Sequence, residues 1–118
     1  MSRRGHFSGL AGEEIAARLY EAEGGRVAAT RWRCPAGEID LIVAFPRLVV
    51  FVEVKARRDH AGAAGAVSAA QWRRLGAAAE CWLAACADAP DCRFDLVLID
   101  RAGRAERLCD ARSFDAEF

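Results

Sequence analysis

Apolar residues recur at helical spacing in two stretches of the chain. In residues 8–23 the apolar positions, set among many alanines, are Leu10, Ile15, Leu19 and Tyr20. In residues 68–87 they are Trp72, Leu75, Ala79, Trp82, Leu83 and Cys86. Such spacing is typical of a helix that buries one face, so it predicts two amphipathic helices, the first ended by Gly24 and Gly25.

Strand-like runs lie between these helices. Residues 26–34 predict a first strand, which the turn residues at 35–37 end. Residues 38–44 and 48–56 are rich in β-branched side chains and predict a hairpin around the short connection between them.

Two further strands follow the second helix. The run FDLVLI at 94–99 predicts a buried strand, and a turn around Gly103 leads to a weaker strand over 105–109. The order α-β-β-β-α-β-β predicts an α/β fold in which the helices pack on a mixed sheet.

The composition fits one globular domain over residues 1–118. Hydrophobic residues make up 53% of the chain and charged residues 29%, which suits a single modest core. No apolar run approaches the roughly 20 residues needed to cross a bilayer, and the N-terminal MSRRGHFSGLAGEE has no apolar stretch of a secretory signal behind it. We therefore expect a cytoplasmic protein that does not enter a membrane.

The cysteines and histidines indicate no metal site. The five cysteines are odd in number and contain no C-x-x-C pair: Cys34, Cys81, Cys86, Cys92 and Cys109. This spacing argues against a disulfide framework and a structural zinc site, so we expect buried, reduced thiols. His6 and His60 stand alone on expected loops.

Charge is distributed unevenly although the net charge is zero. Residues 47–74 hold six basic and two acidic residues, whereas residues 75–118 hold five basic and nine acidic ones. A zero net charge gives no global reason to expect a nucleic-acid partner. The uneven distribution predicts either a polarised surface or only an ordinary solvated face.

The predicted hairpin carries the candidate chemistry. Side chains alternate along a strand, so Glu53 and Lys55 share one face, and Glu38 and Asp40 share one face of the preceding strand. If Val43 and Leu48 flanked the turn, Asp40 would lie diagonal to Glu53, within reach of one common site.

Neighbouring carboxylates on an apolar sheet need a compensating charge. Oxygen ligands without cysteine or histidine favour a hard divalent cation such as Mg²⁺ or Mn²⁺. Lys55 is the only lysine of the chain, and a compact ammonium beside such an ion can stabilise charge on a phosphate. The alternative is structural: Glu53 and Lys55 as same-face neighbours, or a cross-strand Glu38–Lys55 ion pair.

The D-x(12)-E-x-K spacing of Asp40, Glu53 and Lys55 resembles the PD-(D/E)-x-K nuclease superfamily, which includes restriction enzymes and archaeal Holliday-junction resolvases. Five segments in order are similar to the bacterial YraN family: GEEIAARL at 12–19, GEIDLIV at 37–43, VFVEVKARR at 50–58, AV at 66–67 and RFDLV at 93–97. The three-letter motif alone is weak, but the ordered set covers nearly the whole chain.

The resemblance implies a restriction-endonuclease-like αβββαβ core. It implies that Asp40 and Glu53 are metal ligands, that the Val54 carbonyl is a further ligand, and that Lys55 is the catalytic lysine. It also implies a helical glutamate in the site, and the G-E-x-x-A match assigns this role to Glu13.

The first helix carries a second glutamate beside Glu13. Glu14 is expected at the surface, paired with Arg18 four residues later. The simpler interpretation of both Glu13 and Glu14 is that acidic residues favour a helix N-terminus.

The chain departs from the family pattern at two positions. The family usually has asparagine where this chain has Arg31, so the local turn that this asparagine would build is not predicted here. It usually has lysine where this chain has Gln71, which can contact the attacking water or a phosphate. Ser68 and Gln71 also fit an S-x-x-Q capping box, in which the Gln71 side chain bonds back to the Ser68 backbone, and we favour this cap.

Basic and aromatic residues indicate how nucleic acid would bind. The candidate contacts are Arg31, Arg33, Arg57, Arg58, Arg73 and Arg74. Trp32 would either stack on an unpaired base or, as we favour, pack on the core. Trp72 and Trp82 are expected in the core or in a dimer contact.

The leading expectation is a metal-dependent endonuclease that hydrolyses phosphodiester bonds in DNA, including branched DNA, or in structured RNA. Mg²⁺ or Mn²⁺ would be its cofactor, and DNA is favoured over RNA as the partner. The alternative is a nucleic-acid-binding module with weak or no catalysis. A homodimer is expected because the pattern holds more large apolar groups than so small a core hides.

Overall fold

The structure is a computed structural model of the chain. It describes the backbone of residues 2–56 and 67–112, and the side chains of residues 11–56 and 67–112. Its elements are α1 (Ser2–Ala22), β1 (Arg26–Cys34), β2 (Gly37–Phe45), β3 (Leu48–Ala56), α2 (Ala69–Ala84), β4 (Asp91–Ile99) and β5 (Ala105–Arg112).

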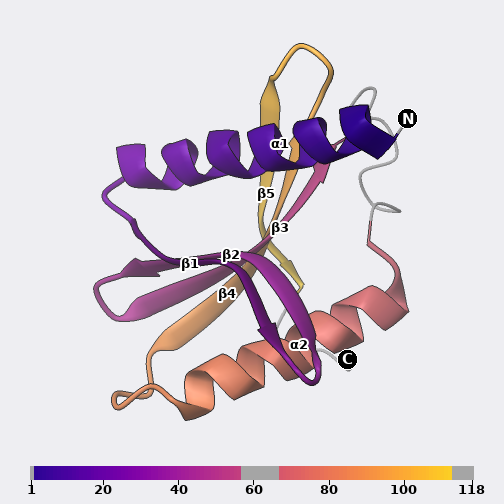
Figure 1. The fold of residues 1–118 in the computed structure, drawn as a ribbon. Helices are drawn as coiled ribbons and strands as arrows, with labels where there is room; N and C mark the ends of the chain where they lie inside the picture. The colour runs from indigo at the N-terminus through magenta and orange to yellow at the C-terminus, as the bar shows by residue number, and fades with distance from the viewer. Residues whose placement is uncertain (1, 57–66, 113–118) are drawn as a thin grey trace.

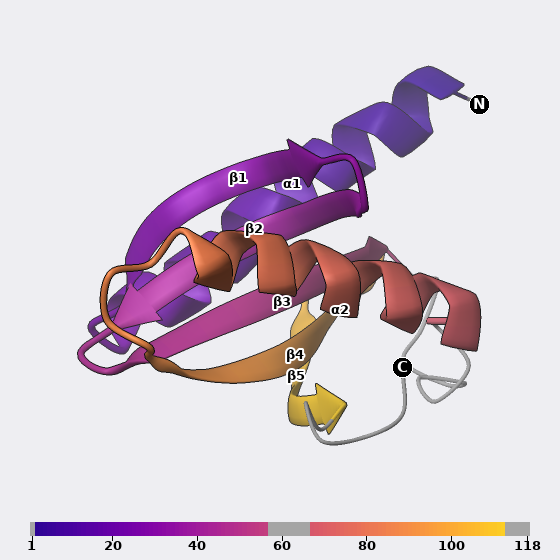
Figure 2. The same cartoon turned by 90° about the horizontal axis from the view of Figure 1, so that it is seen from below.

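The fold is α/β, as predicted, with a mixed five-stranded sheet between two helices. The strands lie in the order β1-β2-β3-β4-β5, and only β3 and β4 run parallel. A parallel pair needs a crossover connection, and α2 lies on the segment that joins β3 to β4. α1 covers one face of the sheet and α2 the other (Figures 1 and 2). This arrangement is compatible with the expected αβββαβ core.

The alternation of side chains along β3 supplies both halves of the core. Val50 and Val52 pack toward α1, whereas Phe51 packs toward α2. The α1-side cluster consists of Ala16, Tyr20, Leu41, Val43, Val50, Val52, Val97 and Ile99. A strand buried on both faces reads as a continuous apolar run, and this is the pattern of LVVFV at 48–52.

The predicted elements are all present; β1 and β3 have the predicted bounds, and the ends of the other elements are shifted. α1 begins at Ser2 instead of residue 8, and α2 ends at Ala84 instead of residue 87. The last turn of α2 is tightened because Cys86 N donates to the Leu83 carbonyl, three residues back. β4 begins at Asp91, earlier than predicted, because it pairs there with Leu48 of β3.

The hairpin turn is shorter than predicted. Phe45 pairs with Leu48, which leaves Pro46 and Arg47 as a two-residue turn. Arg47 adopts a φ of 68°, which fits a type II turn, where proline occupies the first central position and the second has a positive φ.

The cysteines are less buried than predicted. Cys34, Cys86 and Cys92 are half-buried, Cys81 and Cys109 are exposed, and all five thiols are free. Cys34 and Cys92 lie near strand ends and pack against the α2-side core, whereas Cys81 lies on α2, Cys86 just beyond it and Cys109 on β5. The expectation of reduced thiols fits these positions, but the expectation of buried thiols was wrong.

A buried polar network ties α1 to the sheet on the face away from α2. The Asp95 carboxylate is fully buried in β4 and accepts hydrogen bonds from the Tyr20 hydroxyl at 2.6 Å and from Arg93 at 2.8 and 2.9 Å. The Asp110 backbone N–H of β5 donates to it as well. Burial, followed by the contact with Asp95, raises the pKa of the Tyr20 hydroxyl. Because the buried charge has several donors, the network fixes α1 against β4 and β5.

In the part of the chain that the structure describes, neither helix is long and apolar enough to cross a membrane.

Candidate active site

The candidate site lies where β2 and β3 separate. The last paired residues of these strands are Leu41 and Val52, whereas β2 stays paired with β1 to the end of the strand. Beyond the last pair, the Val54 backbone N–H donates to Oδ2 of Asp40 at 2.9 Å. A carboxylate therefore accepts the hydrogen bond that a strand carbonyl would otherwise take, and this bond fixes Asp40 in the fork.

Asp40 and Glu53 are closer than the sequence predicted. Phe45 pairs with Leu48, so the assumption that Val43 and Leu48 flank the turn was wrong. The true register brings Asp40 across from Glu53 instead of diagonal to it. The shift equals two residues, so both side chains keep the predicted face of the sheet.

Glu53 is a carboxylate in a core position. Its exposure is 6%, on the face that α2 covers. Gln71 of α2 donates from Nε2 to Glu53 Oε2 at 2.6 Å, and Lys55 Nζ lies 3.3 Å from the same oxygen. Of the two structural alternatives for Lys55, the pairing with Glu53 is therefore present.

The Gln71 side chain does not cap its own helix. Ser68 is the N-cap of α2, and its hydroxyl accepts a hydrogen bond from the Gln71 backbone N–H. This half of the capping box was predicted correctly, but the favoured return bond from the Gln71 side chain was wrong. The side chain donates to Glu53, because a buried carboxylate needs donors more than an exposed helix end does.

The electrostatics of the pair favour an added positive charge. The pKa of Glu53 is raised to about 8, first by burial and then by the negative charge of Asp40 and a hydrogen-bonding contact with it, while Lys55 opposes the shift. Near neutral pH the pair therefore retains a proton, and a cation can replace that proton. Two oxygen donors without sulfur or imidazole suit a hard divalent ion.

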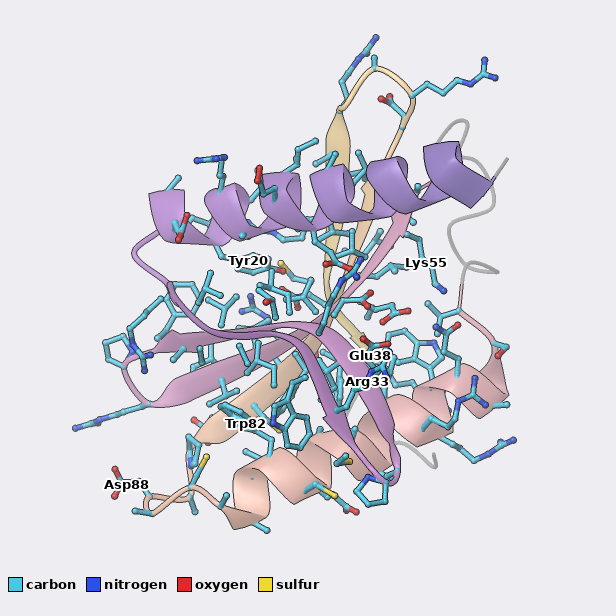
Figure 3. The ribbon with its side chains drawn as sticks, in the orientation of Figure 1. Tyr20, Arg33, Glu38, Lys55, Trp82 and Asp88 are labelled. Atoms are coloured by element: carbon cyan, nitrogen blue, oxygen red, sulfur yellow. The ribbon has the colours of Figure 1, made fainter. Side chains whose placement is uncertain are left out.

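The pair opens into a small cleft of about 170 Å³ between the sheet and α2. Its lining consists of Glu38, Asp40, Glu53, Gln71, Arg74 and Leu75. Figure 3 shows Lys55 and Glu38 at the same end of the sheet, with Asp88 at the opposite end. The cleft has room for a few waters or a phosphate group, and Arg74 contributes a basic residue to its wall.

Glu13 lies near this pair but is bonded elsewhere. Arg31 Nε donates to Glu13 Oε1 at 2.9 Å. The pKa of Glu13 is raised, chiefly by burial and also by the charge of Asp40, although the Arg31 hydrogen bond opposes the shift. Across the described residues, no three His, Cys, Asp or Glu side chains are grouped closely enough to hold one ion. A metal-supporting role for Glu13 stays a prediction.

The neighbouring Glu14 behaves as predicted. Its side chain is 70% exposed, against 16% for Glu13, and it lies 3.9 Å from Arg18. The inward member of the two acids is therefore Glu13.

Arg31 occupies a backbone conformation that suits asparagine better than arginine. Its φ is 49°, in the left-handed region that asparagine enters more readily than other side chains. The asparagine expected from the family resemblance would fit this position without the ion pair, whereas Arg31 gains the ion pair with Glu13.

The other basic candidates are spread around the cleft. Arg33 is exposed and lies 3.6 Å from Glu38, and Arg73 and Arg74 are exposed on α2. Arg57 and Arg58 lie outside the described residues, as do His60 and the side chain of His6.

The tryptophans pack against the protein. Trp32 and Trp82 meet edge to face with ring centroids 5.4 Å apart, and Trp72 meets Phe94 in the same geometry at 6.3 Å. The favoured interpretation of Trp32 as a packing residue agrees with this contact.

Sequence reasoning missed two features of the site. The hydrogen bond from Val54 to Asp40 depends on the strand separation, for which the sequence carries no signal. The contribution of Arg74 to the cleft wall follows from its position three residues after Gln71, one helical turn along α2, and that spacing could have revealed it.

Comparison with known proteins gives one consistent family. The model of the uncharacterised protein family UPF0102 matches residues 12–99. A UPF0102 protein of Azorhizobium caulinodans is 45% identical over 108 residues, covering 87% of this chain and 80% of the relative. A relative from Cereibacter sphaeroides is 42% identical, and the match covers 90% of this chain and 92% of the relative. A relative from Ralstonia pickettii is 45% identical, and the match covers 92% of each chain. The chain therefore belongs to UPF0102, the YraN family.

Proposed function

We propose that this protein is a metal-dependent endonuclease that hydrolyses phosphodiester bonds in DNA. One observation carries the proposal: the buried Glu53 carboxylate lies beside Asp40 in a cleft, with the Lys55 ammonium 3.3 Å away. A structural ion pair alone would not need the second carboxylate, which raises the pKa of Glu53 and opposes its ionisation.

The donor set suits Mg²⁺ or Mn²⁺ as the cofactor. Asp40 and Glu53 would hold the ion, with the Val54 carbonyl as a further oxygen ligand and water or phosphate in the remaining positions. Such an ion supplies charge neutralisation at the phosphate and a more acidic bound water.

The side chains of the chain have separate tasks in this reaction. Lys55 stabilises the negative charge that develops on the phosphate as water attacks phosphorus and the bond to the leaving oxygen breaks. Gln71 holds Glu53 through the 2.6 Å hydrogen bond, which keeps one carboxylate oxygen oriented. Arg74 and the exposed Arg33 and Arg73 attract the phosphate backbone without reading its sequence.

We propose DNA as the partner, because the superfamily that the chain resembles includes enzymes that act on duplex and branched DNA. A homodimer would present one active site to each strand of a duplex, so we propose that the protein acts as a homodimer. The proposed location is the cytoplasm, where both DNA and Mg²⁺ are available in bacteria.

Cleavage of labelled DNA tests the proposal. The panel consists of linear, flapped and four-way duplexes, each with Mg²⁺, Mn²⁺ or EDTA. Lys55→Ala and Glu53→Ala should lower cleavage by at least about 100-fold, since each removes a group that stabilises the transition state or its ion. Glu14→Gln is the matched control, because Glu14 is an exposed acid next to Glu13. Cleavage that survives both variants would refute the assignment.

A second candidate function is a nucleic-acid-binding module without effective catalysis. It is favoured by the engagement of Glu13 with Arg31, which leaves Asp40 and Glu53 as the only carboxylates in contact at the fork among the described residues. Folded protein that binds the panel but cleaves no member of it with either ion would favour this candidate.

A further inference from the structure

Two cysteines that are far apart in sequence meet where the β1–β2 turn packs on α2. Cys34 is the last residue of β1, and Cys81 lies in the second half of α2. The turn is pressed against the helix: a Cβ added at Gly37 would lie 3.4 Å from the Arg74 Cβ and carbonyl oxygen. Figure 1 shows this hairpin end against α2. The contact is fixed by the fold and does not depend on the cysteines.

An aromatic contact beside the cysteines holds the same two elements together. Trp32 shares a strand face with Cys34, and Trp82 follows Cys81 in the helix. Their rings meet edge to face with centroids 5.4 Å apart. These contacts hold the end of β1 and the β1–β2 turn against α2 near the two thiols.

The two thiols are neighbours and are reachable from solvent. The Cys34 and Cys81 side chains lie within interaction range, since each shifts the pKa of the other. Cys81 is exposed and Cys34 is half-buried. The other three cysteines have no thiol contact of this kind among the described residues.

The surroundings of the pair make its members chemically unequal. Burial opposes ionisation of Cys34, but hydrogen bonds from the Cys81 thiol and from the Ala36 and Gly37 backbone N–H groups outweigh it and lower the pKa of Cys34. The pKa of Cys81 is raised, chiefly by the same contact with Cys34. Because the thiolate is the nucleophile, Cys34 is the more reactive member.

We propose that Cys34 and Cys81 form a redox site, in which a hydroperoxide converts the two thiols into an intramolecular disulfide. The Cys34 thiolate attacks a peroxide oxygen, the O–O bond breaks, and Cys34 becomes a sulfenic acid while water or an alcohol leaves. The Cys81 sulfur then attacks the Cys34 sulfur, the S–O bond breaks, and a second water leaves. The two thiols lose two electrons and two protons, which the peroxide takes up.

The disulfide would tie the β1–β2 hairpin to α2 beside the cleft. Glu38, which follows the Pro35–Ala36 turn by two residues, and Arg74 of α2 both line that cleft, so the bond would fix one of its walls. The redox site itself does not depend on the proposed nuclease function, because thiol oxidation is measured without nucleic acid or metal.

Peptide mapping of the full chain tests this proposal. The reduced protein is treated with hydrogen peroxide in slight excess, the remaining thiols are alkylated, and the digest is analysed by mass spectrometry. We expect one cross-linked peptide pair that contains Cys34 and Cys81, formed at least about tenfold faster than any oxidation of Cys86, Cys92 or Cys109, because peroxide selects the thiol with the most thiolate character. Reduction with dithiothreitol should break the Cys34–Cys81 cross-link.

Two variants separate the steps. In Cys81→Ser, Cys34 should stop at the sulfenic acid and react with dimedone. In Cys86→Ser, the matched control at a half-buried cysteine just beyond α2, the cross-link should form as in the wild type. Random pairing of the cysteines, or oxidation of Cys34 no faster than of Cys86, would overturn the proposal, as would a dimedone adduct that is equal in wild type and Cys81→Ser.

Discussion

Burial and charge are in direct conflict at Glu53. The carboxylate is held by Gln71 and Lys55, yet it lies beside Asp40 and almost out of water. An apolar residue would pack at this position without that conflict, so the unfavourable charge is the feature that points to a cation site.

The raised pKa of Glu53 predicts how stability depends on pH. The folded pKa of about 8 lies above the ordinary value of 4.5, so the folded protein holds the extra proton between these values. The stabilisation is complete below the unfolded pKa and is lost as pH rises through the folded pKa. Between pH 5 and 9, the free energy of unfolding of the wild type should fall by about 2–4 kcal/mol relative to Glu53→Gln.

Urea unfolding at several pH values measures this difference. Glu14→Gln, at the exposed position next to Glu13, is the control and should follow the wild-type curve. Parallel curves for the wild type and Glu53→Gln would contradict the assigned shift.

Arg31 gives a second prediction at the residue scale. Its positive φ suits asparagine better than any side chain without a local polar group. Both Arg31→Asn and Arg31→Ala lose the half-exposed ion pair with Glu13, but only asparagine relieves the backbone. The asparagine variant should therefore be more stable than the alanine variant by about 0.5–1 kcal/mol in urea unfolding. Equal stability, or a more stable alanine variant, would show that the backbone conformation is not strained.

At the scale of elements, the site depends on the separation of β2 from β3. Their ladder ends at Leu41 and Val52, and the next interaction between the strands is the hydrogen bond from Val54 to Asp40. Asp40 is therefore both a structural acceptor and a candidate ligand, and these two roles can be separated by substitution.

Substitution of Asp40 by asparagine or alanine separates the roles. Asparagine keeps a carbonyl oxygen for the Val54 N–H, so the free energy of unfolding of Asp40→Asn should lie within about 1 kcal/mol of the wild-type value. Asp40→Ala leaves the N–H without a partner and should lower the free energy of unfolding by about 1–3 kcal/mol. Urea unfolding without divalent ions measures both. If alanine costs no more than asparagine, the hydrogen bond does not hold the fork together.

The sequence predicted the elements better than their junctions. The bounds of β1 followed from the glycines before it and the turn residues after it, and the faces of Glu53 and Lys55 followed from the alternation of side chains. The two-residue turn was not predicted, because the local sequence does not indicate that the arginine after the proline adopts a positive φ. The Gln71 side chain was assigned to a helix cap because local sequence cannot reveal a buried carboxylate on a distant strand.

At the scale of the whole molecule, zero net charge means that any attraction for DNA is local. Arg74 lines the cleft together with Glu38, Asp40 and Glu53, and Arg33 lies 3.6 Å from Glu38. The empty cleft should repel a phosphate, and a bound divalent ion should reverse that balance.

This balance predicts how ions affect DNA binding. Ca²⁺, which binds oxygen ligands as Mg²⁺ does, should tighten DNA binding by the wild type by about tenfold at fixed ionic strength. Asp40→Asn in EDTA should bind about as tightly as the wild type in Ca²⁺, because the substitution removes a negative charge. Fluorescence anisotropy measures the DNA affinity of both proteins in Ca²⁺ and in EDTA. Equal affinities in all four conditions would contradict a role for the ion in DNA binding.

Calorimetric titration with Mn²⁺ at pH 8.5, above the raised pKa of Glu53, measures whether Asp40 and Glu53 together bind a divalent cation, as we claim. We predict a weak one-site signal in the wild type, with a dissociation constant on the order of 0.1–1 mM because only two carboxylates take part. The signal should disappear in Asp40→Asn and in Glu53→Gln and persist in Glu14→Gln. The same binding signal in all four proteins, or none in the wild type, would contradict the claim.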